Sequence, residues 1–318
     1  MSRLLERPLE RADLAACSEV FYAASDELYA RWNQPPLPRH DADRLRSLFS
    51  ELAFGPGGNG WVVARGEGPP VAFGIAIERE ATWFLSFLFV QPGVQAGGLG
   101  RGLLRRLGPD PGGPAGAAGA LRHTCIDSLQ PISAGLYATF GLLPRVPIYE
   151  LLGRPREEAL PALPDGVIAV PFLLPAGAAN GKVVALPSDL LAELEAVDRR
   201  VLGWRRRADH RAWLDDGRLL VRYRARDGAP IGYGYVHRSG RSGPIAVRHA
   251  ELLPAVLGDL LGRLQPPDAW RLYVPGPSAA LSALIEAGMR ISGNPAIWSS
   301  SADGPAWDGY LPASFARL

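Results

Sequence analysis

The stretch FVQPGVQAGGLGRGLLRRLG, residues 89–108, decides how the fold of this chain is interpreted. It overlaps an apolar run, TWFLSFLFV (82–90), that predicts a buried strand, and its GLLRRL segment has the spacing of a basic amphipathic helix. Between strand and helix, glycine occupies positions 97, 98, 100 and 102. Glycine at this density costs backbone entropy and packs no side chain, so we expect a backbone that comes very close to a ligand.

Glycine-rich turns between a strand and a helix bind phosphate through backbone N–H groups and the positive end of the helix. A P-loop would end in Gly-Lys-Ser/Thr, but the only lysine of this chain is Lys182. A dinucleotide fingerprint needs glycine where Leu103 stands. The residues present have the form Gln-x-x-Gly-x-Gly: Gln95, Ala96, Gly97, Gly98, Leu99 and Gly100. With Arg101 as an added cation, they predict a diphosphate-binding loop.

At this motif the sequence resembles the GNAT superfamily of N-acetyltransferases, whose pyrophosphate loop is Gln/Arg-x-x-Gly-x-Gly/Ala. The approach LFVQPGVQ (88–95) is similar to the family's hydrophobic-hydrophobic-Val-x-Pro-x-x-Gln. The resemblance implies that the strand before the loop splays from the next one, and that the thioester of acetyl-CoA lies in the gap. It also implies that the backbone at Phe89 and Val90 contacts the cosubstrate. An N–H that holds the carbonyl oxygen there is worth roughly 10²–10³ in rate.

The resemblance also implies a general acid. The family carries Leu-Tyr-x-x-x-Gly-Phe on the helix after the fifth strand, and here Leu136 and Tyr137 are followed by Gly141 and Leu142. Tyr137 is therefore the candidate that protonates the leaving CoA thiolate. A thiol with a pKa of about 8.5 and a phenol of about 10 are close enough for this transfer. The alternative is a core aromatic on an amphipathic helix.

The general base is less defined. Ser86 stands where many family members have a glutamate, and a serine does not deprotonate an ammonium unaided. Glu78 and Glu80 at the hairpin, or Asp127 at the end of the fifth strand, could act through a water. We take Glu78 as the candidate, although each of the three could equally be a surface or turn carboxylate.

The acceptor is expected over the splay, lined by the first helices. Tyr29 and Trp32 are the candidates to contact it, although an apolar helix face would show the same pattern. Two cysteines and scattered histidines give no metal-like spacing, so we expect no metal site. The acceptor is an amine of a small molecule or a peptide, and the sequence does not identify it.

The two halves of the chain are alike. A predicted hairpin at 61–78 matches one at 219–237, the strand 82–90 matches 242–247, and the strand-loop-helix segment 121–141 matches 270–288. The repeat is of domain size rather than a solenoid repeat. We predict an α/β (α+β) fold with two tandem GNAT-like domains, each a mixed, mostly antiparallel sheet flanked by helices. The Pro-rich stretch 153–166 places the boundary between 1–155 and 156–318.

The second half has lost the chemical features of the first. Its loop, Arg248 to Pro254, contains no glycine, and the counterpart of Tyr137 is Leu284. We therefore expect an active first domain and a degenerate second one with a structural or acceptor-shaping role. The segment DRRVLGWRRRADHRAWL (198–214) is dense in Arg and Trp. It either presents Arg206, His210 or Trp213 to the acceptor or forms a solvated helix face with cation–π contacts, which we favour.

Composition narrows the class of protein. The chain has 318 residues, a formal net charge of +2 and 47% hydrophobic residues, typical of a globular protein with ample core. No apolar run approaches the roughly 20 residues of a membrane helix, and the N-terminus does not have the pattern of a secretory signal. We expect a cytoplasmic, bacterial protein with neither nucleic acid nor membrane as partner; the sequence also allows a homodimer.

These observations predict an acetyl-CoA-dependent N-acetyltransferase that transfers acetyl directly to an amine, with catalysis in the first domain. A non-catalytic acyl-CoA sensor would keep the loop without needing Tyr137. An acyltransferase for longer acyl chains is the other alternative, which bulky Phe87 and Phe89 would oppose if their rings point toward the thioester.

Overall fold

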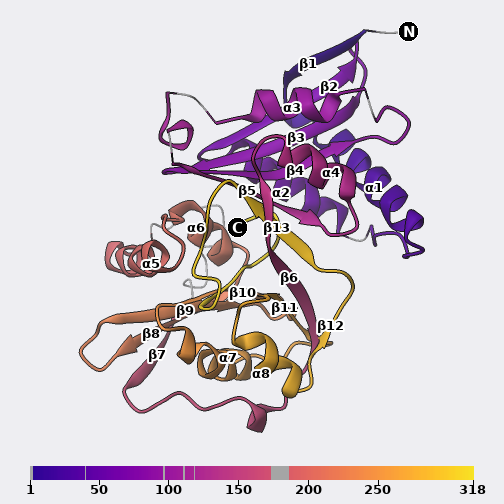
Figure 1. Cartoon of the computed structure of the whole chain (residues 1–318). Coiled ribbons are helices and arrows are strands. Elements are labelled where there is room, and N and C mark those ends of the chain that lie inside the picture. Colours follow the sequence, from indigo (N-terminus) through magenta and orange to yellow (C-terminus); the bar gives the residue numbers. More distant parts are fainter. Residues whose placement is uncertain (1–2, 40, 96, 110–111, 118, 173–185) are drawn as a thin grey trace. The chain divides into compact units, whose positions relative to one another are not determined.

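The computed structural model describes residues 3–39, 41–95, 97–109, 112–117, 119–172 and 186–318 (Figure 1). The chain divides into two compact units. Unit 1 comprises Met1–Pro144 and Trp298–Ala302, and unit 2 comprises Arg145–Ile297 and Asp303–Leu318. The boundary thus falls at Pro144 where the sequence had suggested residue 155, and a short segment from the second half of the chain belongs to unit 1.

Each unit follows the predicted order of strand, two helices, three strands, helix, strand and helix. In unit 1 these are β1 (Leu4–Pro8), α1 (Leu14–Arg31), α2 (Ala42–Phe54), β2 (Gly58–Arg65), β3 (Pro70–Arg79), β4 (Thr82–Val90), α3 (Leu99–Leu107), β5 (Leu121–Asp127) and α4 (Pro131–Ala138). In unit 2 they are β7 (Val167–Phe172), α5 (Ser188–Val201), α6 (Arg207–Asp215), β8 (Leu219–Ala225), β9 (Pro230–Val236), β10 (Ser242–Val247), α7 (Leu253–Gly262), β11 (Trp270–Pro275) and α8 (Ala280–Glu286). The predicted duplication is confirmed in the order of elements.

The remaining elements are short or link these. The strands are β6 (Leu143–Gly153), β12 (Arg290–Ile291), β13 (Ala296–Ser300) and β14 (Tyr310–Leu311). Single 3-10 turns are η1 (Arg11–Asp13), η2 (Pro114–Gly116), η3 (Glu157–Ala159) and η4 (Ala250–Leu252).

The sheet of unit 1 runs in the order β1-β2-β3-β4-β5. Neighbouring strands are antiparallel except β4 and β5, which are parallel and joined through α3. β3 and β4 read as nearly continuous apolar runs because both of their faces are covered by helices. The predicted mixed, mostly antiparallel sheet is confirmed.

The segment Trp298–Ala302 completes unit 1 beside β5. Ser301 N–H donates to the Arg122 carbonyl at 2.9 Å, and Arg122 N–H donates to Ser301 Oγ at 3.0 Å. The buried Trp298 Nε1 donates to His123 Nδ1 at 3.1 Å. Unit 1 therefore contains residues that bond to partners 175 and 179 positions earlier in the chain.

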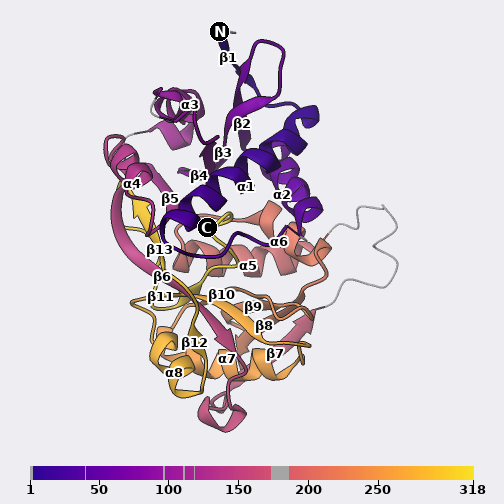
Figure 2. The same ribbon diagram turned by 90° about the vertical axis from the view of Figure 1, so that its right-hand side faces the viewer.

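Two apolar layers cover the sheet of unit 1. On one face, α1 and α2 contribute Phe21 and Phe49, which pack against Phe73, Phe87 and Phe89 with ring centroids 4.8–6.2 Å apart. On the other face, leucines of α3 and residues of α4 pack against β3, β4 and β5. Figure 2 shows α1 and α2 together, with α3 separate from them. A fully buried Phe contributes roughly 1.5–3 kcal/mol, so the aromatic layer holds α1 firmly over β4.

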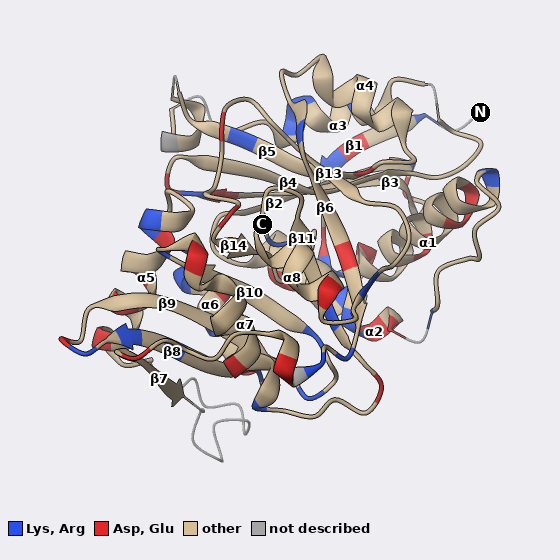
Figure 3. Cartoon of the chain, turned by 60° about the horizontal axis from the view of Figure 1, so that its bottom comes forward, with Lys and Arg blue, Asp and Glu red and all other residues tan. Residues whose placement is uncertain are grey.

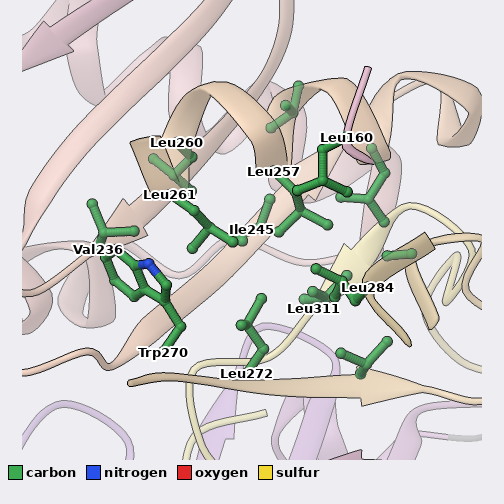
Figure 4. Packing of buried hydrophobic residues seen from close by; sticks show 14 of the residues in the cluster. Leu160, Val236, Ile245, Leu257, Leu260, Leu261, Trp270, Leu272, Leu284 and Leu311 are labelled. Atoms are coloured by element: carbon green, nitrogen blue, oxygen red, sulfur yellow. The ribbon is translucent and has the colours of Figure 1, made fainter. Parts of the chain in front are cut away.

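Unit 2 has a sheet in the order β14-β10-β9-β8-β7, antiparallel throughout. β11 and β12 each pair antiparallel with β6. One large apolar core lies beneath α7 and α8, and Figure 4 shows Leu257 and Leu260 of α7, Leu284 of α8, Ile245 of β10 and Leu311 of β14 in it.

Polar side chains are buried on the α5 and α6 side of unit 2. This buried polar cluster, each member at most 1% exposed, consists of Asp198, Arg206, His210, Tyr233, Tyr235 and Tyr310. The expectation of a solvated face is therefore wrong for Arg206, His210 and Trp213, which are buried, whereas Arg199, Arg200, Arg205 and Arg207 are exposed. The expected cation–π contact is confirmed, with Arg206 Cζ 5.0 Å from the Trp213 ring centroid.

Charged residues of both signs are interspersed along α1, α2, α5 and α6, whereas α4 carries none (Figure 3). Among the described residues, no helix is long and apolar enough to cross a lipid bilayer.

Candidate active site

Strands β4 and β5 separate partway along their length. Their parallel pairing runs from Thr82 opposite Leu121 to Leu85 opposite Thr124. β4 then continues to Val90 and β5 to Asp127 without further pairing between them in the described chain. Thr124 Oγ1 donates to the Leu85 carbonyl at 2.8 Å, which closes the gap at this point. The splay that the resemblance implied is therefore present in unit 1.

A bulge in β4 coincides with the start of the splay. Ile75 lies opposite Phe87 and Ala76 opposite Leu85, so Ser86 is the extra residue on β4. A bulge bends its strand and re-aims the residues beyond it. Ser86 is thus the bulged residue of β4, directly after the last pair that β4 makes with β5.

The backbone of β4 beyond the bulge presents donors to the gap. Gln91 N–H donates to the Val71 carbonyl of β3 at 2.8 Å. Because hydrogen-bonding groups alternate sides along an antiparallel strand, Phe89 also faces β3, whereas Leu88 and Val90 face away from it. This corrects one expectation: the backbone toward the gap comes from Leu88 and Val90, with Phe89 engaged opposite Phe73. The spacing motif alone did not reveal this alternation.

The glycine loop ends at the N-terminus of α3. Gly98 is the residue before the helix, with φ 78° and ψ 2°, a left-handed conformation that glycine adopts without strain. The first helical bond runs from Gly102 N–H to the Gly98 carbonyl at 2.9 Å, so the N–H groups of Leu99, Gly100 and Arg101 precede it and lack helical acceptors. Gly97, Gly98 and Arg101 are exposed. Ala96, also predicted in the loop, lies outside the described residues.

The glycines of the motif differ in what surrounds them. A Cβ at Gly98 would enter open space, with no described heavy atom within 4 Å beyond its chain neighbours. A Cβ at Gly100 would lie 3.2 Å from Leu136 Cδ2 and 3.9 Å from Leu88 Cδ2. A side chain at Gly98 would therefore enter open space beside the N-terminus of α3, whereas Gly100 allows α3 to approach Leu136 of α4.

Gln95 ties the loop to its surroundings. Its Nε2 donates to the Val90 carbonyl and to Glu27 Oε2 of α1, both at 3.2 Å. Glu27 Oε1 in turn accepts from Arg31 at 2.5 Å. The glutamine of the motif thus positions the loop, and Glu27 is a residue near the gap that the sequence did not indicate.

The predicted acceptor residues lie at the end of α1. Trp32, 50% exposed, donates from Nε1 to the Leu129 carbonyl at 3.0 Å, in the loop after β5. The Tyr29 carbonyl accepts from Trp32 N–H and Gln34 N–H, which ends the helix. The end of α1 therefore reaches both the glycine loop, through Glu27, and the open end of β5, through Trp32.

Tyr137 lies on α4 and packs in the apolar layer under α3, with 5% of its surface exposed. Burial raises the pKa of its phenol well above the usual value, and a hydrogen bond with Ser133 opposes the shift. The phenol is therefore protonated at physiological pH, the form that a general acid needs. Its catalytic role stays a prediction.

Glu78 is not brought to the glycine loop. It lies opposite Trp83, whereas Val90 lies opposite Ala72, six residues away along β3, or about 20 Å at 3.3 Å per residue. It also lies beyond the closed end of the splay. Asp127, at the open end of β5, accepts Leu129 N–H through Oδ1 at 2.9 Å and is better placed.

Unit 2 lacks the equivalent loop. The residues after β10 form η4 and then α7, and Leu284 on α8 is fully buried in the apolar core. The last residues of β10 pair with β14, at Ile245 opposite Leu311 and Ala246 opposite Tyr310. Only unit 1, among the residues described, combines an open gap with a glycine turn at a helix N-terminus.

No protein-family model and no curated protein matches the sequence. Solved structures do match it. A candidate acetyltransferase from Pyrococcus horikoshii is similar over 99% of this chain and 96% of its own, with a TM-score of 0.68 and 16% identity. A GCN5-related N-acetyltransferase from Sphaerobacter thermophilus is similar over 96% and 98%, with a TM-score of 0.57 and 18% identity.

A third similar structure is a tandem GNAT protein from the clavulanic acid biosynthesis pathway, determined without AcCoA. The likeness covers 95% of this chain and 99% of that one, with a TM-score of 0.54 and 15% identity. The chain therefore has the tandem GNAT fold along essentially its whole length. This agrees with the element order and with the splay described above.

Proposed function

We propose that the chain is an acetyl-CoA-dependent N-acetyltransferase whose catalysis takes place in unit 1. The observation that carries the proposal is the gap between β4 and β5, which begins at Leu85 and Thr124 and opens toward the N-terminus of α3. Acetyl-CoA needs both features: its diphosphate needs the N-terminus of a helix, and its extended pantetheine arm needs the unpaired edge of a strand.

Acetyl-CoA would bind with its diphosphate at the N–H groups of Leu99, Gly100 and Arg101, where the helix dipole favours negative charge. Its pantetheine arm would extend along β4 and accept from Leu88 and Val90 N–H. An N–H directed at the thioester oxygen stabilises the charge that develops there during acyl transfer.

In the reaction the acceptor amine attacks the thioester carbonyl, a C–N bond forms, and the C–S bond breaks. Tyr137 would give its proton to the departing thiolate and recover one from the ammonium by way of solvent. Asp127 replaces Glu78 as the proposed acceptor of the amine proton because of its position at the open end of β5. Trp32 and Tyr29 would contact the acceptor, an amine of a small molecule or peptide.

The rings of Phe87 and Phe89 are directed into the aromatic layer with Phe21 and Phe49. Because these contacts direct the rings to α1 and α2 rather than to the thioester, Phe87 and Phe89 do not select between an acetyl and a longer acyl group, and a longer-chain acyltransferase stays an alternative.

A second candidate function is acyl-CoA sensing without catalysis, which the burial of Tyr137 favours. Mass spectrometry of the protein with acetyl-CoA and a panel of amines, antibiotics and peptides separates the two. An acetylated product together with free CoA supports the enzyme; binding of acetyl-CoA without any product supports the sensor.

A further inference from the structure

Unit 2 starts its own splay in the same place as unit 1. Gly240 to Ser242 adjoin β11, with an isolated parallel bridge between Arg241 and Arg271 and a bond from Ser242 Oγ to the Arg271 carbonyl at 2.9 Å. Beyond Ser242 the described residues of β10 pair with β14 rather than with β11. The gap in unit 2 is therefore filled by polypeptide.

The register shows which groups are occupied. Arg248 N–H donates to the Ile231 carbonyl of β9 at 2.8 Å, as Gln91 N–H donates to Val71 in unit 1. Val247 is thus the counterpart of Val90, and its N–H donates to the Gly309 carbonyl at 2.9 Å. Two residues before Val247, Ile245 lies opposite Leu311 of β14. Its counterpart in unit 1 is Leu88, whose backbone faces the gap.

We propose that β10 of unit 2 forms a strand-binding slot, occupied by residues 309–311 in the place that unit 1 leaves open for a pantetheine arm. The Gly309 carbonyl then accepts from Val247 N–H, in the way that we propose a pantetheine carbonyl accepts from Val90 N–H in unit 1. The comparison with pantetheine rests on the proposed function, whereas the slot itself rests on the pairing of β10 and β14.

The buried polar cluster anchors the occupant. Arg206 Nη1 donates to Tyr310 Oη at 2.6 Å, and Arg206 is itself held by Asp198 at 3.1 Å. Burial favours protonation of Asp198, but the charges of Arg206 and His210 and the hydrogen bonds with His210 and Tyr233 together outweigh it and lower the pKa of Asp198 to about 2. Arg317 adds a bond to Asp209 at 3.3 Å. The buried charge of Arg206 thus holds the hydroxyl of Tyr310, the middle residue of 309–311.

The fit is close on the apolar side as well. Leu311 enters the same core as Ile245 and Leu284 (Figure 4). A Cβ at Gly309 would lie 2.6 Å from the Val247 carbonyl oxygen, too close for any side chain unless the strands move apart. The slot therefore selects glycine at this position of its occupant.

The test is hydrogen–deuterium exchange on the full chain carrying Gly309→Ala. We expect the amides of Ile245 and Val247 to be protected in the wild type and to exchange at least tenfold faster in the variant. Gly262→Ala is the matched control, because a Cβ there meets no described atom within 4 Å. Unprotected β10 amides in the wild type, or protection unaltered by Gly309→Ala, would overturn the proposal.

A synthetic peptide spanning residues 304–314, added in excess to the Gly309→Ala variant, should restore protection of β10, whereas a scrambled peptide should not. Failure of the native peptide would count against a polypeptide-binding slot. Protection of the same amides by acetyl-CoA would also overturn the inference. Absence of acetyl-CoA binding anywhere in the chain would instead remove the proposed function and leave the slot standing.

Discussion

Replacing Gly98 by alanine tests the phosphate loop with a built-in control. Gly98 has φ 78° and Gly93, in the same loop, has φ 81°; a Cβ at either meets no described heavy atom within 4 Å beyond its chain neighbours. An L-residue in this conformation costs about 1–2 kcal/mol, so Gly98→Ala and Gly93→Ala should lower the free energy of unfolding by similar amounts. Only Gly98 directly precedes α3.

The two variants should differ in binding. A methyl group at position 98 would enter the open space beside the N–H groups that we propose to bind the diphosphate, and loss of one charge-assisted hydrogen bond costs about 1.5–3 kcal/mol. Calorimetric titration should therefore show acetyl-CoA affinity weakened at least tenfold, about 1.4 kcal/mol, in Gly98→Ala and nearly unchanged in Gly93→Ala. Equal affinities for both variants would refute the assignment of the loop.

Tyr137→Phe should lower kcat roughly 10²-fold with little change in acetyl-CoA affinity. Turnover equal to that of the wild type would show that Tyr137 only packs in the core. Asp127→Asn keeps the acceptor for Leu129 N–H, so a fall in kcat at unchanged stability would mark the base, and unaltered kinetics would exclude it. Burial lowers the pKa of His123 to about 3, so the stability that its neutral form contributes is lost as pH falls below 6.5, by about 2 kcal/mol at pH 5. Denaturant titrations of wild type and His123→Gln should show this difference in pH slope, and identical slopes would contradict it. A chain ending at Pro155 lacks Trp298 and should aggregate; a soluble, acetyl-CoA-binding fragment would show that β13 is dispensable.

Local patterns predicted the elements well. Alternating and continuous apolar runs placed the strands from β2 to β5 and from β8 to β11, because each pattern depends on neighbours in sequence. The segment Trp298–Ala302 belongs to unit 1 because it bonds to β5, and the bonded residues are separated by more than half of the chain. No local pattern encodes such pairing. The boundary was placed at residue 155 because the sequence does not show that β6 pairs with β11 and β12 of unit 2.

The site was predictable where chemistry demands a particular residue. The motif placed Gln95 and Gly98 in the turn before α3, whereas the left-handed conformation of Gly98 and the bond from Gln95 to Val90 were found only in the structure. The direction of each backbone N–H depends on register with β3, which is why Phe89 was expected where Leu88 lies. Glu78 was misplaced for the same reason, since distance along a hairpin cannot be judged before its register is known.

Dense charge misled the interpretation of 198–214. Arg and Asp side chains are mostly exposed, so a solvated helix is the ordinary expectation. Here Arg206 donates to both Asp198 and Tyr310 inside unit 2, and Tyr310 comes from more than a hundred residues away. A buried network assembled from distant segments leaves little periodic signal.

The central claim is that acetyl-CoA binds once per chain, in the gap of unit 1. The most direct measurement is hydrogen–deuterium exchange with and without saturating acetyl-CoA, combined with calorimetric stoichiometry. The account predicts one site per chain, with new protection at Leu88, Val90 and the first residues of α3, and no change at Ile245 to Val247. Two sites per chain, or protection confined to unit 2, would contradict it.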